Sequence, residues 1–185
     1  MPIKLPAGIP SGKVLQEEQI FVMSNERAYH QDIRPLQILF VNLMPNKQET
    51  EAQFFRLLGN SPIQIEVHLA YTATYQPTHT SKKYLGRFYK TFQDISERYF
   101  DGLIVTGAPV ELMNFEDVHY WQELCRMMEW SKTHVFSSLF VCWGAQAALQ
   151  YFHNIPKYRL EKKCFGVFPH QLYAPKHHEF MRGID

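Results

Sequence analysis

Residues 135–149 read VFSSLFVCWGAQAAL, an apolar strand that runs through a cysteine directly into a helix. Such a turn leaves Cys142 at the carboxyl end of a sheet, beside the unpaired N–H groups and positive dipole at the amino end of a helix. These groups favour a thiolate and can hold an oxyanion. Gly144 allows a tight turn and close approach of helix to strand. The stretch predicts a nucleophile for acyl transfer or, since free cysteines are often buried, a packed core cysteine.

The other two cysteines have different surroundings. Cys125 lies among large apolar neighbours of a helical stretch, so we expect it to fill the core. Cys164 lies in the apolar run 164–168, and we expect it inside a strand. Three cysteines do not pair into a disulfide framework, and we find neither a secretory leader nor an apolar run of membrane length. We therefore expect a reduced, cytoplasmic protein that does not enter a membrane.

Composition favours one domain without a nucleic-acid partner. The chain has 185 residues, 45% of them hydrophobic, which is enough for one core. A formal net charge of +1 gives no reason to expect binding to nucleic acid. Residues 1–34 are rich in proline and glycine, so we expect an N-terminal extension outside the core, wrapping over the domain or a neighbouring subunit. The domain itself is expected to span residues 35–185.

Strands and helices are expected to alternate along the chain. Periodicity predicts strands at 36–44, 63–69, 101–109 and 135–141, and helices at 47–58, 85–99, 115–134 and 145–154. This order predicts an α/β fold, a doubly wound and mostly parallel sheet with helices on both faces. Ligands of such sheets bind beyond the carboxyl ends of the strands, where the turn 107–109 and Cys142 both lie. The polar segment 72–81 is expected to be a loop, one that closes over a site.

Four motifs add a specific resemblance. They are NLMPNKQETE at 42–51, TGAPVE at 106–111, CWGAQAAL at 142–149 and IPK at 155–157. In this order, and over essentially the whole chain, they resemble the homoserine O-acyltransferase family of methionine biosynthesis. The resemblance implies a class I glutamine-amidotransferase-like fold and a homodimer. It also implies transfer of an acyl group from a coenzyme A thioester to the hydroxyl of L-homoserine through a cysteine thioester.

The resemblance assigns roles to individual residues. Cys142 matches the acyl-accepting nucleophile, in agreement with the turn around it. Lys163 falls where the family has a lysine that contacts homoserine, and its ammonium could pair with the substrate carboxylate. The alternative is one more surface lysine, like Lys162. For the oxyanion we expect the backbone N–H groups of Trp143 and of Ala108, in the turn after residue 106.

Glu111 bears on the choice of acyl donor. Family members that use succinyl-CoA resemble one another in having glycine here, whereas members with glutamate resemble acetyl-CoA users. A glutamate fills the space that a longer acyl chain needs, and its charge repels the terminal carboxylate of succinate. We therefore expect acetyl-CoA as co-substrate, with no bound cofactor. The alternatives are succinyl-CoA as donor and a solvated loop carboxylate at Glu111.

Basic side chains elsewhere give weaker signals. Lys47 begins a helix near the same sheet edge and could contact a coenzyme A phosphate or the acyl group, although such lysines are more often solvated. His170, His177 and His178 lie after the strand expected to follow the helix behind Cys142, and one of them could approach Cys142, a role that the resemblance does not give them. We interpret the last two as a solvated pair. No Cys/His spacing fits zinc, so no metal is expected.

Departures from the family pattern concern the last part of the chain. Phe165 stands where a small polar residue is usual, and Asn154 stands where glycine is expected, although asparagine tolerates a left-handed cap. Residues 182–185 look like the start of the next family motif, and the family's catalytic histidine and its carboxylate partner fall beyond them. We expect the 185-residue chain to form a thioester slowly and to transfer it poorly. The non-enzymatic alternative is an inactive truncated product.

Two related enzyme classes fit less well. Cysteine hydrolases of this fold usually have histidine directly after the nucleophile, where this chain has Trp143. A glutaminase is expected to have glycine two residues before the cysteine, where Phe140 stands.

Overall fold

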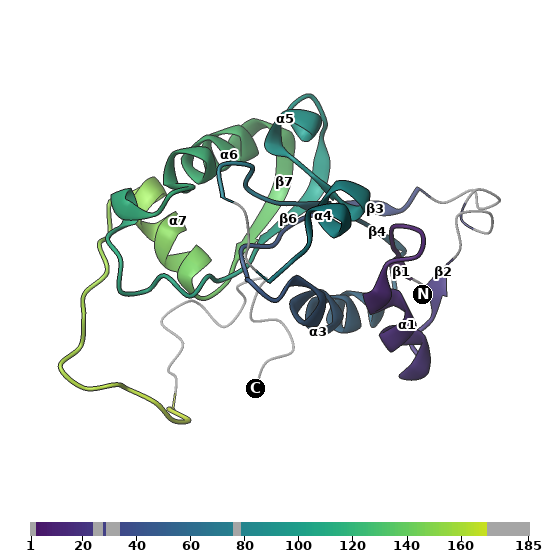
Figure 1. Cartoon of the computed structure of the whole chain (residues 1–185), viewed down its shortest axis with the longest axis horizontal. Helices are drawn as coiled ribbons and strands as arrows, with labels where there is room; N and C mark the ends of the chain where they lie inside the picture. The colour runs from purple at the N-terminus through teal and green to yellow at the C-terminus, as the bar shows by residue number, and fades with distance from the viewer. Residues whose placement is uncertain (1–2, 24–27, 29–33, 76–78, 170–185) are drawn as a thin grey trace, which may run out of the picture.

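A parallel sheet forms the centre of the computed structural model, which describes residues 3–23, 28, 34–75 and 79–169 (Figure 1). Seven strands pair in the order β2-β1-β4-β3-β6-β7, with β5 beside the end of β4. Every pairing between them is parallel. The strands are β1 Ile3–Lys4, β2 Val22–Met23, β3 Leu36–Val41, β4 Ile65–Ala70, β5 Tyr89–Lys90, β6 Phe100–Val105 and β7 Val135–Phe140.

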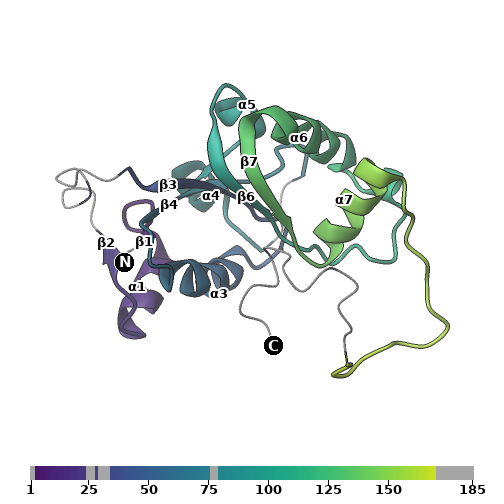
Figure 2. The same cartoon turned by 180° about the vertical axis from the view of Figure 1, so that it is seen from behind.

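Helices cover both faces of this sheet (Figures 1 and 2). Successive side chains of a strand point to opposite faces. Leu39 and Val41 pack in a cluster with α6 and α7, whereas Phe40 between them packs with α1, α3 and α4. The predicted α/β architecture with a doubly wound parallel sheet is therefore confirmed. The helices are α1 Pro10–Glu17, α3 Lys47–Gly59, α4 Lys82–Phe88, α5 Phe92–Ile95, α6 Trp121–His134 and α7 Trp143–His153, with a 3₁₀ turn at Phe115–Asp117.

The helix expected at 85–99 is wrong. Tyr89 and Lys90 instead form β5, which pairs with the last two residues of β4. The backbone N–H and the hydroxyl of Thr91 then donate to the Asp94 carboxylate, both at 2.8 Å, and this cap starts the separate helix α5. The helix expected at 115–134 is likewise divided, because α6 begins only at Trp121.

The expectation that residues 1–34 stay outside the core is wrong for residues 3–23. Strand β1 lies between β2 and β4, so it is an inner strand of the sheet. Ile3 of β1 and Leu15 of α1 are fully buried in the cluster that also holds Phe40 and Phe55. Proline and glycine at this end shape short elements between turns and do not keep the segment out of the core.

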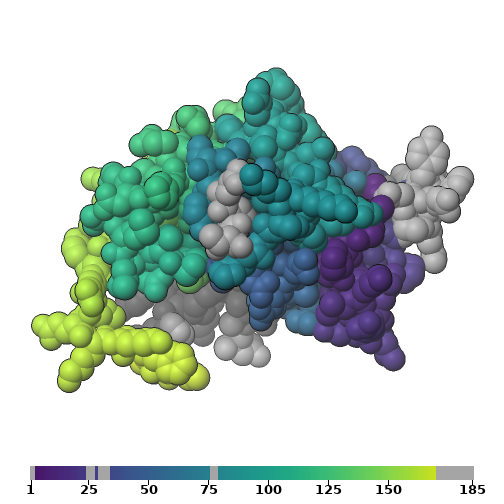
Figure 3. Space-filling model, in the orientation of Figure 1, coloured from purple at the N-terminus to yellow at the C-terminus, as the bar shows by residue number. Residues whose placement is uncertain are grey.

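Two stretches are more exposed than their sequence predicts. Strand β7 is the edge of the described sheet, and Phe136 on it is 93% exposed. Residues 154–169 form neither helix nor strand and reach away from the body (Figure 3). Cys164 is exposed there, so its expected place inside a strand is wrong. In the part of the chain that the structure describes, no helix combines the length and apolar character needed to cross a membrane.

Candidate active site

Cys142 occupies a strained turn between β7 and α7. Its φ of 56° and ψ of −122° belong to a region that residues with a side chain rarely adopt. The strand ends at Phe140 and the helix begins at Trp143, so the chain reverses within two residues. The thiol is exposed, and the alternative of a packed core cysteine is therefore wrong. Trp143 is only 1% exposed, and its buried ring anchors the start of the helix.

Two glycines make this turn sterically feasible. A Cβ on Gly144 would lie 2.6 Å from the carbonyl oxygen of Thr106, so only glycine lets α7 approach the end of β6 this closely. A Cβ on Gly107 would lie 2.9 Å from the Cβ and 3.1 Å from the Sγ of Cys142. The turn after β6 therefore packs directly against the thiol, as the position of both segments at the carboxyl edge of the sheet predicts.

The backbone around the thiol offers unused donors. The first hydrogen bonds of α7 run from Gly144 to Val141 and from Ala145 to Cys142, which leaves the Trp143 N–H outside the helix ladder. Neither this N–H nor that of Ala108 donates to another group within the described ranges. Such N–H groups can stabilise an oxyanion. Their role here stays a prediction.

Glu111 and Lys163 line one cavity of about 930 Å³. It opens between the loop 111–117 and the segment 156–164, with side chains of α7 on a third side. Cys142 is not among the lining residues, so the structure brings the two charged residues together without bringing the thiol into the same cavity. Glu111 lies four residues after Gly107, which packs against the thiol.

Lys163 and its neighbour Phe165 interact with each other. Both side chains are exposed, and the Lys163 Nζ lies 5.3 Å from the centre of the Phe165 ring, a cation–π contact. The departure from the family pattern at Phe165 therefore falls beside the lysine expected to bind homoserine. Asn154 has the left-handed conformation that its type allows, with φ 53° and ψ 37°, and it ends α7.

Lys47 is buried, so the alternative of a solvated lysine is wrong. Its side chain is 4% exposed, and Nζ donates to the carbonyl oxygens of Asn42 at 2.5 Å and Met44 at 3.3 Å. Burial lowers its pKa to about 8, although the nearby Glu51 carboxylate opposes that shift. The ammonium stabilises the loop after β3 through these two hydrogen bonds. Contact with coenzyme A would require it to leave these carbonyls, and such contact stays a prediction.

Two charged residues with specific partners were not singled out from sequence. Glu51 and Lys157 lie inside motifs that carried the resemblance, but spacing does not tell a buried or bridging charge from a solvated one. Lys157 donates to the carbonyl oxygens of Glu111 and Met113, so it holds the backbone next to the carboxylate expected to select the donor. His170, His177 and His178 lie outside the described residues. Among the described ones, no three His, Cys, Asp or Glu side chains gather as metal ligands would.

Comparison with known proteins identifies the family. A family model described as homoserine O-succinyltransferase matches residues 2–185. The chain belongs to the homoserine O-succinyltransferase family. Within it, the chain is 55% identical over 172 residues to a homoserine O-acetyltransferase of Thermotoga petrophila, which covers 93% of this chain and 57% of the relative. Enzymes of the same name from Clostridium acetobutylicum and Geobacillus kaustophilus are 53% and 54% identical over all 185 residues, or 61% of each relative.

The chain thus spans about 60% of the length of the curated relatives it matches. Those relatives are named as acetyltransferases, whereas the family carries the name of the succinyl transfer. Membership in the family therefore leaves the acyl donor to be argued from the site.

Proposed function

We propose that the protein transfers an acetyl group from acetyl-CoA to the hydroxyl of L-homoserine, through a thioester on Cys142. The observation that carries this proposal is the exposed, strained turn at Cys142, with Gly107 against the thiol and unused N–H groups beside it. The acetyltransferase names of relatives at 53–55% identity support the same reaction.

The proposed reaction has two halves. In the first, the Cys142 thiolate attacks the acetyl carbonyl, the N–H groups of Trp143 and Ala108 stabilise the oxyanion, and the bond to the coenzyme A sulfur breaks. The coenzyme A thiolate leaves and takes up a proton. In the second, the homoserine hydroxyl attacks the thioester, its proton passes to solvent, and the Cys142 thiolate leaves. Lys163 pairs with the homoserine carboxylate during this step.

Glu111 selects the donor in this proposal. It lines the cavity that also holds Lys163, and it follows the turn that packs on the thiol. A carboxylate there takes the space of a longer acyl chain and repels the free carboxylate of a succinyl group. Succinyl-CoA remains the second candidate because the family model is described by the succinyl reaction. The homodimer and the cytoplasmic location stay predictions.

The test of the function separates its two halves. The protein is incubated with acetyl-CoA, and release of coenzyme A is followed. L-Homoserine is then added, and O-acetyl-L-homoserine is measured. We expect slow release of up to one equivalent of coenzyme A per Cys142, and a low yield of product that forms only after homoserine is added. Cys142→Ser cannot form the thioester, so it should release no coenzyme A. Release that is unchanged in this variant would refute the proposal, and absence of release in the parent protein would favour the inactive alternative.

The donor is tested by Glu111→Gly. With acetyl-CoA and succinyl-CoA at equal concentration, the parent protein should accept acetyl in preference, and the variant should shift toward succinyl by about tenfold or more, since both space and charge change. An unchanged ratio of the two acyl groups on Cys142 would remove the residue-level support for acetyl-CoA.

A further inference from the structure

Lys157 is less exposed than the side chains around it in the segment 153–169. From His153 to Pro169, every described side chain is exposed except that of Lys157, which is half-buried. The apolar neighbours Ile155, Tyr158 and Leu160 are 50%, 82% and 62% exposed. A segment that turns its lysine inward and its apolar side chains outward does so because the lysine has specific partners.

Within the described ranges, the partners of Lys157 all belong to the loop that carries Glu111. Its Nζ donates to the carbonyl oxygens of Glu111 and Met113, both at 2.5 Å. It also lies 5.1 Å from the centre of the Phe115 ring. An ammonium has three donors, so one lysine can hold two carbonyls and face a ring at the same time. Partial burial lowers the pKa of this amine, while Glu111 opposes the shift.

Phe115 also contacts Trp143, the residue that follows Cys142. The Phe115 ring stacks on Trp121 with centres 5.0 Å apart, and it lies 5.9 Å from the ring of Trp143. Phe115 and Trp143 are both buried. The loop is therefore fixed at one end by packing against the start of α7 and at the other by the bonds from Lys157.

We propose that Lys157 is a positioning residue for acyl-donor selection, because it holds the backbone of the loop 111–115 and so fixes where the Glu111 carboxylate lies. Lys157 does not touch the acyl group in this proposal and acts through Glu111. The inference rests on the proposed function, in which Glu111 excludes the longer, charged acyl chain.

The test combines a chemical and a structural readout. Lys157→Met keeps the aliphatic stem and removes the ammonium, and Lys157→Arg keeps the charge and the donors. Lys83→Met is the matched control, because Lys83 is an exposed lysine on α4 with no hydrogen bond or ion pair to any described residue. Each protein receives acetyl-CoA and succinyl-CoA at equal concentration, and the two acyl groups on Cys142 are counted by peptide mass. Amide hydrogen exchange is measured over residues 109–115.

We expect Lys157→Met to lower the acetyl-to-succinyl ratio by about fivefold or more and to speed exchange in the loop, since an unheld Glu111 excludes succinyl less well. Lys157→Arg should restore most of the ratio, and Lys83→Met should change neither readout. If the parent protein takes acetyl on Cys142 and Lys157→Met has an unchanged ratio, the role of Lys157 is refuted while the proposed function stands. If the parent protein takes neither acyl group, the proposed function fails. In either case, unchanged amide hydrogen exchange over residues 109–115 in Lys157→Met would refute the positioning role of Lys157.

Discussion

At the scale of the residue, the site depends on two glycines, Gly107 and Gly144, at positions where a side chain would not fit. A methyl group on Gly107 would lie 2.9 Å from the Cβ of Cys142, and one on Gly144 would lie 2.6 Å from the carbonyl oxygen of Thr106. The sequence predicted Gly144 in this role from the turn around Cys142. It also placed the turn 107–109 at the same sheet edge as Cys142, but it could not predict the direct contact between Gly107 and the thiol, which joins segments 35 residues apart. Burial of Lys47 was missed for the same reason, because the carbonyls that it binds are aligned only by the folded loop after β3.

Gly107→Ala should block the thiol without unfolding the protein. The new methyl group would lie 2.9 Å from the Cβ and 3.1 Å from the Sγ of Cys142, so the cysteine must shift. We expect thioester formation at Cys142 to slow by about tenfold or more and stability to fall by about 1–2 kcal/mol. Gly86→Ala is the control, because a methyl group there meets nothing within 4 Å and the position is helical. It should stabilise the protein by up to about 1 kcal/mol and leave acylation unchanged. Equal acylation rates in both variants would refute the contact.

At the scale of the element, one buried carboxylate joins four elements. Glu51 of α3 is fully buried and accepts hydrogen bonds from Ser11 of α1 at 3.0 Å, Tyr84 of α4 at 2.7 Å and Tyr89 of β5 at 2.6 Å. Burial raises the pKa of Glu51, and the three hydroxyl donors limit that rise. The N-terminal segment is thus joined to the core by a polar contact as well as by β1. The sequence showed the amphipathic pattern of α3 but not this partner set.

Glu51→Ala should therefore destabilise the protein far more than a surface change would. Removal of the carboxylate leaves buried hydroxyl donors without an acceptor, and we expect a loss of about 3 kcal/mol in the free energy of unfolding, measured by denaturant titration. Hydrogen exchange should rise first in α1. Glu49→Ala on the same helix is the control, because Glu49 is exposed and, among the described residues, pairs only with Asn46. Its loss should stay below about 1 kcal/mol. A similar loss in both variants would show that the buried Glu51 carboxylate does not stabilise the fold in this way.

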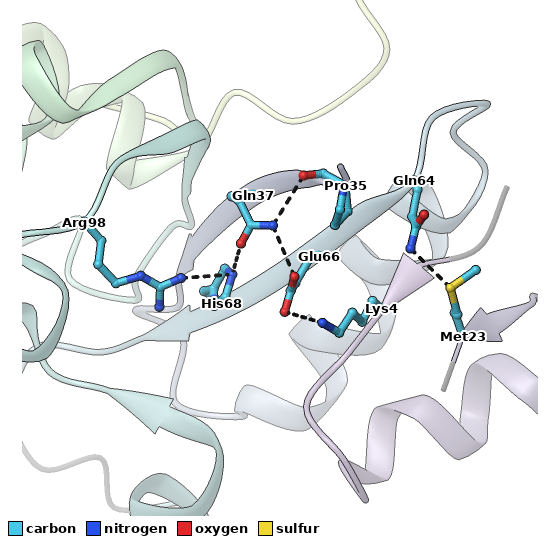
Figure 4. Close-up of polar contacts among 8 residues, drawn as sticks. All are labelled: Lys4, Met23, Pro35, Gln37, Gln64, Glu66, His68 and Arg98. Atoms are coloured by element: carbon cyan, nitrogen blue, oxygen red, sulfur yellow. Dashed lines mark hydrogen bonds and ion pairs between the residues drawn. The ribbon is translucent and has the colours of Figure 1, made fainter. Parts of the chain in front are cut away.

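At the scale of the whole molecule, the sheet separates two apolar clusters, and a polar row crosses three of its strands (Figure 4). Lys4, Glu66 and Gln37 lie side by side in register on β1, β4 and β3. The Gln37 amide oxygen then lies 2.6 Å from Nε2 of His68. Apolar runs predicted the strands β3, β4, β6 and β7 and the helices α3 and α7, because periodicity is local, whereas the helices expected at 85–99 and 115–134 are divided. The position of β1 inside the sheet and the exposure of β7 could not be predicted, since both depend on pairing between distant segments.

This row gives the protein a predictable response to acid. Burial and the nearby Arg98 lower the pKa of His68 to about 4, from an ordinary value of 6.5. The unfolded chain therefore binds a proton at His68 in a pH range where the folded chain does not. This contribution to stability is complete above pH ~6.5 and is lost as the pH falls toward ~4. After allowance for solvent around a half-buried ring, we expect about 2 kcal/mol.

His68→Gln tests that response. The free energy of unfolding is measured between pH 7 and pH 4.5 for both proteins, and the loss on acidification should be smaller in the variant. An equal loss in both proteins would show that His68 does not carry this part of the pH dependence.

We propose that the strained turn, and not exposure alone, makes Cys142 the acyl acceptor. The three cysteines provide the comparison within one molecule, since Cys164 is also exposed and Cys125 is partly buried, with its pKa raised to about 11 by burial and by Glu116. The most direct measurement is peptide mass mapping of all three cysteines after incubation with acetyl-CoA. We expect a single acetyl group on Cys142 and none on Cys164. Equal labelling of both exposed thiols, or labelling of Cys164 alone, would contradict it.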